Sequence, residues 1–226
     1  MNSPEKGEYI DIHTHDSKPG EGIFAVENIM AHEIVHPDTI SAKAFTSGIH
    51  PWHLNENNWE VLLEYVREVS DNPNLIALGE AGFDRLRGPS MELQKSTFEE
   101  QVKIAEGKHK PVIIHCVRAW DELLAAHKNL KPEKPWLVHG FRGKKELANQ
   151  LINRGMYLSF WFDFVLRPES SELIRLLPRE RIFLETDGAD VDIRDIYRKV
   201  ADDLAINVDE LKNIILDNYI LMFKKK

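Results

Sequence analysis

The sequence is poor in cysteine, in long apolar runs and in secretion signals. Cys116 is the only cysteine among 226 residues, which excludes an internal disulfide and favours a reducing compartment. No apolar run approaches the roughly 18 residues of a membrane span, and residues 1–7 lack the pattern of a signal peptide. We therefore expect a cytoplasmic protein that does not enter a membrane.

Clustered positive charge is also scarce. The formal net charge is −8 and the pI is about 5.7. A protein that binds nucleic acid over a broad surface usually carries a basic patch or stripe, and the composition argues against such a surface. If the substrate carries phosphate, bound metals must supply much of the positive charge.

No stretch resembles a linker, an internal repeat or a low-complexity tract. The chain is long enough to bury one core, so we expect a single domain over residues 1–226.

Strand-like apolar runs alternate with helix-like segments along the whole chain. The predicted strands cover residues 9–15, 23–26, 43–47, 75–79, 111–114, 135–138, 156–159 and 181–184. Apolar side chains at three-to-four spacing predict helices at 59–66 and 91–107, and a third begins near 208, where Asn207 and Glu210 stand at capping-box spacing. This alternation predicts a parallel sheet. We expect an α/β fold of the (β/α)8 TIM-barrel type, with a doubly wound open sheet as the alternative.

The first predicted strand carries two histidines at alternate positions. Side chains of a strand alternate between faces, so we expect Asp11, His13 and His15 on one face, and Thr14 on the other. Two imidazoles on one face of a strand can bind the same metal ion.

More residues of the types that bind metals follow later strands. They are Glu80 after the fourth predicted strand, His115 after the fifth, His139 after the sixth and Asp187 after the eighth. Active sites of barrels lie at the carboxyl ends of their strands. Four imidazoles and two carboxylates exceed the needs of one zinc ion and suit two divalent metals, with Glu80 as a bridge. Zinc, magnesium and manganese all remain open.

Short motifs occur in a fixed order along the chain. They are Asp11-Ile12-His13-Thr14-His15, Gly48-Ile49-His50-Pro51, Gly79-Glu80-Ala81-Gly82-Phe83-Asp84, His115-Cys116, His139-Gly140-Phe141 and Glu185-Thr186-Asp187. These motifs resemble those of the TatD family of metal-dependent hydrolases, in the amidohydrolase-like superfamily. The resemblance implies a barrel, a two-metal site and deoxyribonuclease activity. It assigns one metal to His13, His15, Glu80 and Asp187, and the other to Glu80, His115 and His139.

Three positions depart from the family pattern. Val117 stands where the family usually has arginine, with Arg118 one place later, and Arg142 replaces a serine. The segment after Asp187, residues 188–192, is shortened and lacks the usual proline, arginine and asparagine. These groups are expected near the substrate, so hydrolysis is predicted more firmly than DNA as the substrate.

The expected reaction is metal-assisted hydrolysis of a phosphodiester, with Asp187 as the general base and Glu80 setting the separation of the metals. One alternative is an amidohydrolase acting on a small ester, lactone or amide. Another is a metal-binding module without catalysis.

Further residues are candidates for supporting roles. Substrate contacts are predicted for His50, Arg118, Arg142 and Trp161, where arginines would bind phosphate and the indole would stack on a base. Asp11 and Glu185 are expected to orient metal ligands. Cys116 is expected to be a packing residue, because no base stands beside it.

Overall fold

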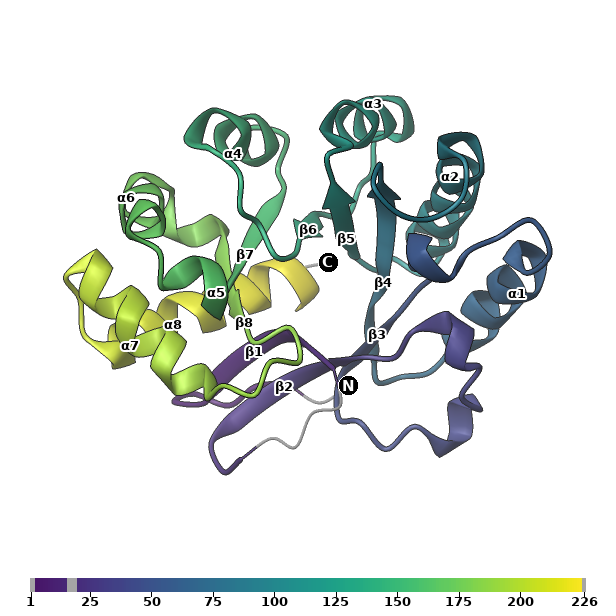
Figure 1. The fold of residues 1–226 in the computed structure, drawn as a ribbon. Coiled ribbons are helices and arrows are strands. Elements are labelled where there is room, and N and C mark those ends of the chain that lie inside the picture. The colour runs from purple at the N-terminus through teal and green to yellow at the C-terminus, as the bar shows by residue number, and fades with distance from the viewer. Residues whose placement is uncertain (1–2, 16–19, 225–226) are drawn as a thin grey trace. The chain divides into compact units, whose positions relative to one another are not determined.

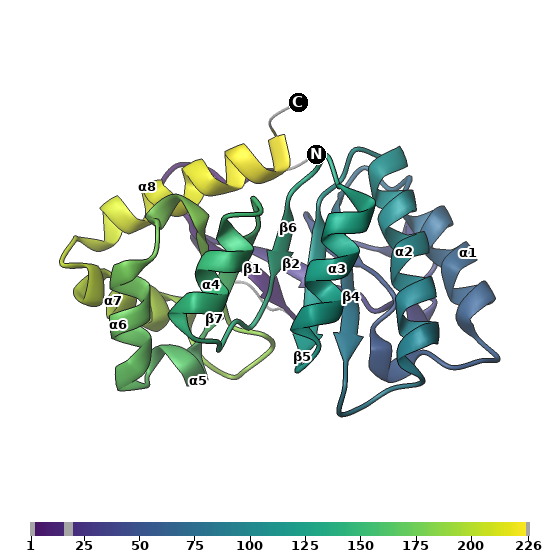
Figure 2. The same cartoon turned by 90° about the horizontal axis from the view of Figure 1, so that it is seen from above.

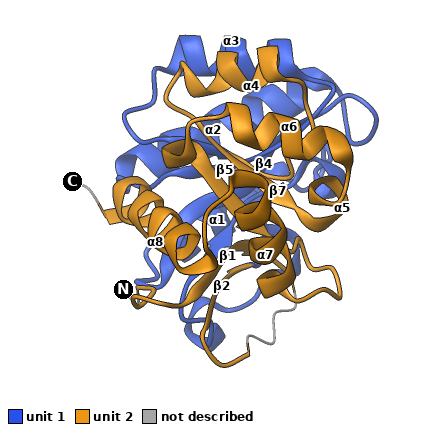
Figure 3. Ribbon diagram, turned by 90° about the vertical axis from the view of Figure 1, so that its left-hand side faces the viewer, with its two compact units in different colours: residues 1, 28–137 blue, residues 2–27, 138–226 orange. Residues whose placement is uncertain are grey.

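The structure is a computed structural model in which residues 3–15 and 20–224 are described. From β3 onward strands alternate with α-helices, and the strand order is that of the chain, from β1 to β8 (Figure 1). This order confirms the predicted alternation. The chain divides into two compact units (Figure 3). Residues 28–137 belong to the first unit, and residues 2–27 and 138–226 belong to the second.

The first unit is built on parallel neighbouring strands. They are β3 (Phe45–Ser47), β4 (Leu75–Asp84) and β5 (Val112–Val117). The helices that follow them are α1 (Trp59–Val69), α2 (Met91–Gly107) and α3 (Trp120–Leu130), which lie along the outer side of these strands (Figure 2). Short 3-10 turns are η1 (Ala31–Glu33), η2 (Pro37–Thr39) and η3 (Pro51–His53). Strand β6 (Trp136–Val138) runs across the division between the units.

Helices α1 and α2 confirm the periodicity that predicted them. Leu62, Leu63 and Val66 of α1 are buried. Helix α2 begins after Ser90, whose hydroxyl accepts a hydrogen bond from the Leu93 amide and so satisfies one free amide of the first turn.

The second unit contains the remaining elements. Its strands are β1 (Tyr9–Thr14), β2 (Ile23–Asn28, whose last residue belongs to the first unit), β7 (Tyr157–Trp161) and β8 (Ile182–Glu185). Its helices are α4 (Lys145–Ile152), α5 (Phe162–Val165), α6 (Pro168–Leu176), α7 (Ile193–Leu204) and α8 (Val208–Tyr219). Two short segments are η4 (Arg179–Arg181) and the π-helical η5 (Ile220–Lys224). The predicted cap of α8 is confirmed, since Asn207 accepts a hydrogen bond of 2.8 Å from the Glu210 amide.

Strands β4 and β5 run further than predicted. The prediction ended them where their apolar runs end, whereas β4 continues to Asp84 and β5 to Val117. Glycine at position 82 keeps the two strands paired, because a Cβ there would lie 2.0 Å from the carbonyl oxygen of His115. Glu80 and His115 therefore lie within strands, and the expectation that they follow them is wrong.

The strict alternation expected for β1 is interrupted. Asp11 and Thr14 were expected on opposite faces, yet both lie within hydrogen-bond distance of the Thr186 hydroxyl, at 2.6 and 2.9 Å. The register of β1 against β2 shifts between Asp11 and Thr14. Such an irregularity turns side chains away from their regular directions.

Within the described ranges, no helix combines the length and the apolar character needed to cross a membrane. The single-domain expectation stays a prediction.

Candidate metal centre

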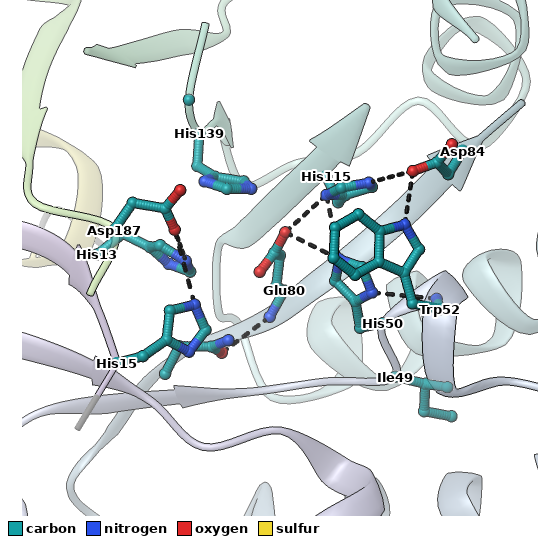
Figure 4. Close-up of polar contacts among 12 residues, drawn as sticks. His13, His15, Ile49, His50, Trp52, Glu80, Asp84, His115, His139 and Asp187 are labelled. Carbon is teal, nitrogen blue, oxygen red and sulfur yellow. Dashed lines mark hydrogen bonds and ion pairs between the residues drawn. The ribbon is translucent and has the colours of Figure 1, made fainter. Parts of the chain in front are cut away.

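The first unit brings three potential metal ligands together. His115 Nδ1 lies 2.7 Å from Glu80 Oε1, and His50 Nε2 lies 3.2 Å from the same oxygen (Figure 4). The two imidazole nitrogens are 3.1 Å apart. All three residues are buried, and one ligand atom from each lies within 4.8 Å of the others. We call His50, Glu80 and His115 the first ligand group.

Asp84 and Trp52 hold the histidines of this group. Asp84 Oδ2 lies 3.0 Å from His115 Nε2 and accepts a hydrogen bond of 2.6 Å from Trp52 Nε1 (Figure 4). The Trp52 amide donates to His50 Nδ1 at 3.1 Å. These contacts direct the remaining nitrogen of each imidazole toward Glu80.

Asp84 also closes the turn that follows β4. Its Oδ1 accepts hydrogen bonds from the amides of Leu86 and Arg87, at 2.7 and 3.0 Å. Burial tends to raise the pKa of Asp84, but the hydrogen bonds from Trp52, His115 and these amides outweigh it and hold the pKa below its usual value. The Asp84 carboxylate is therefore suited to remain charged beside His115.

The second unit contains a second set of potential ligands. Asp187 Oδ1 lies 3.6 Å from His13 Nε2 and 3.7 Å from His15 Nε2 (Figure 4). His13 is fully buried, whereas the side chains of His15 and Asp187 are 27% and 26% exposed. A buried imidazole nitrogen and a partly exposed carboxylate are donors that suit a metal ion open to solvent. We call His13, His15 and Asp187 the second ligand group.

The backbone positions Asp187 at the end of β1. Its amide donates a hydrogen bond of 3.0 Å to the carbonyl oxygen of His13. Asp187 itself has a φ of +53°, and Gly188 has a φ of +73°. This left-handed turn directs the chain away from β8 immediately after Thr186.

His139 lies beside this second group. Its ring centroid is 4.4 Å from that of His13. Its Nδ1 is 3.5 Å from Glu185 Oε1, which also accepts a hydrogen bond from the Gly140 amide at 2.7 Å. The other oxygen of Glu185 accepts from Ser159, so this buried carboxylate is fixed beside His139 as expected.

Asp11 lies against Thr186, the residue before Asp187. Its carboxylate accepts hydrogen bonds from the amide and the hydroxyl of Thr186, at 3.0 and 2.6 Å. Burial raises the pKa of Asp11 to about 7, although these hydrogen bonds oppose the shift. Asp11 thus fixes the residue that precedes Asp187.

The other predicted contacts fall outside the ligand groups. The guanidinium carbon of Arg142 lies 4.9 Å from the ring centroid of Trp161, so these two residues form a pair. Arg118 is exposed one residue after β5, and within residues 3–15 and 20–224 it forms no ion pair. Burial raises the pKa of the Cys116 thiol, which is consistent with a packing role.

Asp84, Trp52 and the position of His50 were missed by the residue-level prediction. Asp84 stands four residues after Glu80, so both side chains point to the same face of a regular strand. That spacing was a usable signal for Asp84. The contact of His50 with Glu80 required the path of η3 and could not be obtained from spacing.

The family of TatD-related DNases matches residues 32–224 of this chain. The 3′-5′ ssDNA/RNA exonuclease TatD of Erwinia tasmaniensis is 30% identical over 174 residues, which cover 74% of this chain and 66% of that protein. A second exonuclease of that name, from Erwinia billingiae, is 32% identical, and the match covers 63% of this chain and 56% of that protein. The uncharacterized metal-dependent hydrolase YcfH of Escherichia coli K12 is 28% identical over 79% of this chain and 73% of its own length.

Solved structures share the fold. The TatD homologue YJJV of Escherichia coli K12 superposes with a TM-score of 0.80 at 21% identity, covering 98% of this chain and all of the other. The hydrolase TatD family protein of Entamoeba histolytica gives a TM-score of 0.76 at 19% identity, over 97% and 99% of the two chains. These likenesses confirm the predicted (β/α)8 fold class.

Fold and family together define the class of metal-dependent hydrolases. The chain belongs to the family of TatD-related DNases, whose match extends over most of its length. The predicted family and enzyme class are thereby confirmed.

Proposed function

We propose that this protein is a metal-dependent nuclease that hydrolyses phosphodiester bonds of single-stranded nucleic acid. The family membership supports the reaction type. Relatives named as ssDNA/RNA exonucleases support the class of substrate. The formal net charge of −8 makes bound cations the natural means of attracting a polyanion to this chain.

The donor atoms of both ligand groups fit divalent metals. Imidazole nitrogens and carboxylate oxygens converge in each group, and such mixed donors bind zinc and manganese, with magnesium favouring the oxygens. We propose two divalent ions, held by His13, His15, Glu80, His115, His139 and Asp187. His50 adds a nitrogen donor beside Glu80.

Each residue then has a definable role. The metals, when bound, lower the pKa of a water molecule and stabilise negative charge on the phosphate. Asp187, with its partly exposed carboxylate, accepts the proton of the attacking water. Glu80 would hold the ions together with the histidines, and its carboxylate would set their separation. Asp84 and Glu185 hold the rings of His115 and His139.

One observation carries the proposal: two imidazoles and a carboxylate meet in a buried position, in a chain of a nuclease family. Buried ionisable groups at this density are costly unless they are paired or bind metal. The Arg142 and Trp161 pair offers a cation and an aromatic face for substrate, and exposed Arg118 offers a second cation.

A panel of substrates tests the proposal. The metal-loaded protein is incubated with single-stranded DNA, single-stranded RNA, simple phosphodiesters, lactones and amides, each with zinc, magnesium or manganese. We expect hydrolysis of the nucleic acids and of the phosphodiesters. Activity confined to lactones or amides would contradict the proposal.

The second candidate is an amidohydrolase that acts on a small molecule. Val117, Arg142 and the short segment at residues 188–192 favour it, because the residues expected near a DNA substrate are replaced there. The same panel decides between the two candidates. The cytoplasmic location also stays a proposal, supported by the single cysteine of the sequence.

A further inference from the structure

Trp52 is an exposed aromatic residue attached directly to the first ligand group. Its indole NH and its amide donate to Asp84 and His50, and its ring lies edge-on to His50 and His115, with centroids 4.9 and 5.6 Å apart. These contacts fix the ring, yet 41% of the residue remains exposed. An apolar ring that is both rigid and exposed has a surface available to a ligand.

Arg87 covers one face of this ring. Its guanidinium carbon lies 4.1 Å from the centroid of the Trp52 ring, and its amide is held by Asp84. Arg87 is exposed and, across the described part of the chain, takes part in no ion pair with a carboxylate. Arg85, two residues earlier, is instead paired with Glu122. The charge of Arg87 is therefore uncompensated, in contrast to that of Arg85.

The turn that carries Arg87 also presents an apolar side chain. Leu86 is 65% exposed, and its amide is fixed by the same Asp84 carboxylate at 2.7 Å. Trp52, Leu86 and Arg87 thus form one rim, organised by the carboxylate that also contacts His115. We call these three residues the Trp52 rim.

The chemistry of this rim matches a nucleotide. A guanidinium is planar and stacks with one face on an indole while its other face accepts a second flat ring. Its N–H groups pair with phosphate oxygens. Every base offers a flat π face, so such stacking tolerates any sequence.

We propose that Trp52 and Arg87 form a stacking subsite for one nucleobase of a single-stranded substrate, with Arg87 between the indole and the base. This inference rests on the proposed nuclease function and adds a substrate contact to it. Because Asp84 links the rim to His115, a base bound here is held at a fixed position relative to the first ligand group.

Oligonucleotides with single abasic positions test the subsite. Binding of a short fluorescent DNA strand is measured by anisotropy in the chelated protein, and kcat and KM are measured in the metal-loaded protein. The strand is used intact and with each terminal nucleotide in turn lacking its base. We expect one abasic position to weaken wild-type binding about tenfold, a typical effect of losing one stacked base.

Substitutions locate that effect on the rim. Trp52→Leu and Arg87→Gln should each raise Kd and KM about tenfold for the intact strand, and should have little effect on the strand abasic at the sensitive position. Trp52→Phe retains an aromatic ring, so its Kd and KM should rise less than those of Trp52→Leu. Arg85→Gln removes a neighbouring exposed charge and serves as the matched control. Circular dichroism checks the fold, and exposed Arg87→Gln remains informative if Trp52→Leu does not fold.

Equal losses on intact and abasic strands, or no loss for either rim variant, would overturn the subsite while leaving the nuclease proposal in place. A wild-type protein that neither binds nor cleaves single strands would overturn both. The two failures are therefore distinguishable.

Discussion

The Oδ2 atom of Asp84 lies 3.0 Å from Nε2 of His115, on the side of the imidazole opposite to the nitrogen that faces Glu80. A carboxylate in this position fixes the ring orientation and the tautomer of a histidine that binds metal through its other nitrogen. Asp84 also accepts hydrogen bonds from Trp52, Leu86 and Arg87. The first ligand group and the turn at Leu86 and Arg87 therefore depend on the same side chain, that of Asp84.

Replacing Asp84 by alanine should weaken metal binding. His115 would lose its orienting partner, and losses of about 10- to 100-fold in metal affinity or activity are typical of such changes. Titration of the chelated protein with zinc, followed by calorimetry, measures the effect. Asp71→Ala, at an exposed carboxylate of the same unit, is the control. Unchanged zinc affinity would contradict the orienting role of Asp84.

Replacing Asp187 by asparagine tests the general base. The amide keeps the size of the side chain but cannot accept the proton of the attacking water, so kcat should fall by about 100-fold or more. Asp190→Asn, three residues later and exposed, should retain the wild-type rate. Turnover by Asp187→Asn at the wild-type rate would contradict the assignment of Asp187 as the general base.

The pKa of Asp11 predicts a pH-dependent stability. Because burial raises this pKa from 3.8 to about 7, the folded protein retains a proton between these pH values that the unfolded chain has lost. The Asp11 contribution to the free energy of unfolding should therefore be full below pH 4 and fall as the pH rises toward 7. Urea titrations of chelated protein from pH 4 to 8 measure this change.

Asp11→Asn removes this titration and keeps a hydrogen-bonding partner for Thr186. The free energy of unfolding of Asp11→Asn should exceed that of the wild type by an amount that grows from pH 4 to pH 7, to the order of a few kcal/mol. Asp38→Asn replaces a carboxylate that is 92% exposed and should follow the wild-type curve. If the free energy of unfolding changes with pH in the same way for Asp11→Asn and the wild type, the raised pKa of Asp11 is contradicted.

Tyr197 connects α7 to β1 through one hydroxyl. This hydroxyl accepts from the Ile10 amide and donates to the Ile10 carbonyl, both at 3.0 Å and both buried. Tyr197→Phe leaves two buried backbone groups without this partner and should cost about 1 to 3 kcal/mol. Tyr65→Phe loses one partly buried bond to Val35 and should cost less. Thermal unfolding of both variants gives the comparison, and equal melting temperatures would refute this role of Tyr197.

The alternation of elements could be predicted because it depends on local periodicity. The bounds of α2 follow directly from its apolar spacing and its Ser90 cap. The metal-binding residue types could also be predicted, since His13, Glu80, His115 and Asp187 stand at or near the ends of the apolar runs that predicted the strands, in a recognisable order.

Contacts between separate segments could not be predicted in the same way. Strand β4 continues to Asp84, whose carboxylate accepts hydrogen bonds from Trp52 in η3 and from Leu86 in the following turn. No apolar pattern in the sequence indicates this continuation. The irregularity of β1 depends on its register with β2. The position of His50 depends on a turn that returns it to Glu80.

The rate of single-stranded DNA cleavage before chelation, after chelation and after metal is restored tests the central claim most directly. The account predicts that chelation abolishes cleavage, that a divalent metal restores it, and that Glu80→Gln protein is not restored. Cleavage by the chelated protein at its original rate would contradict the account.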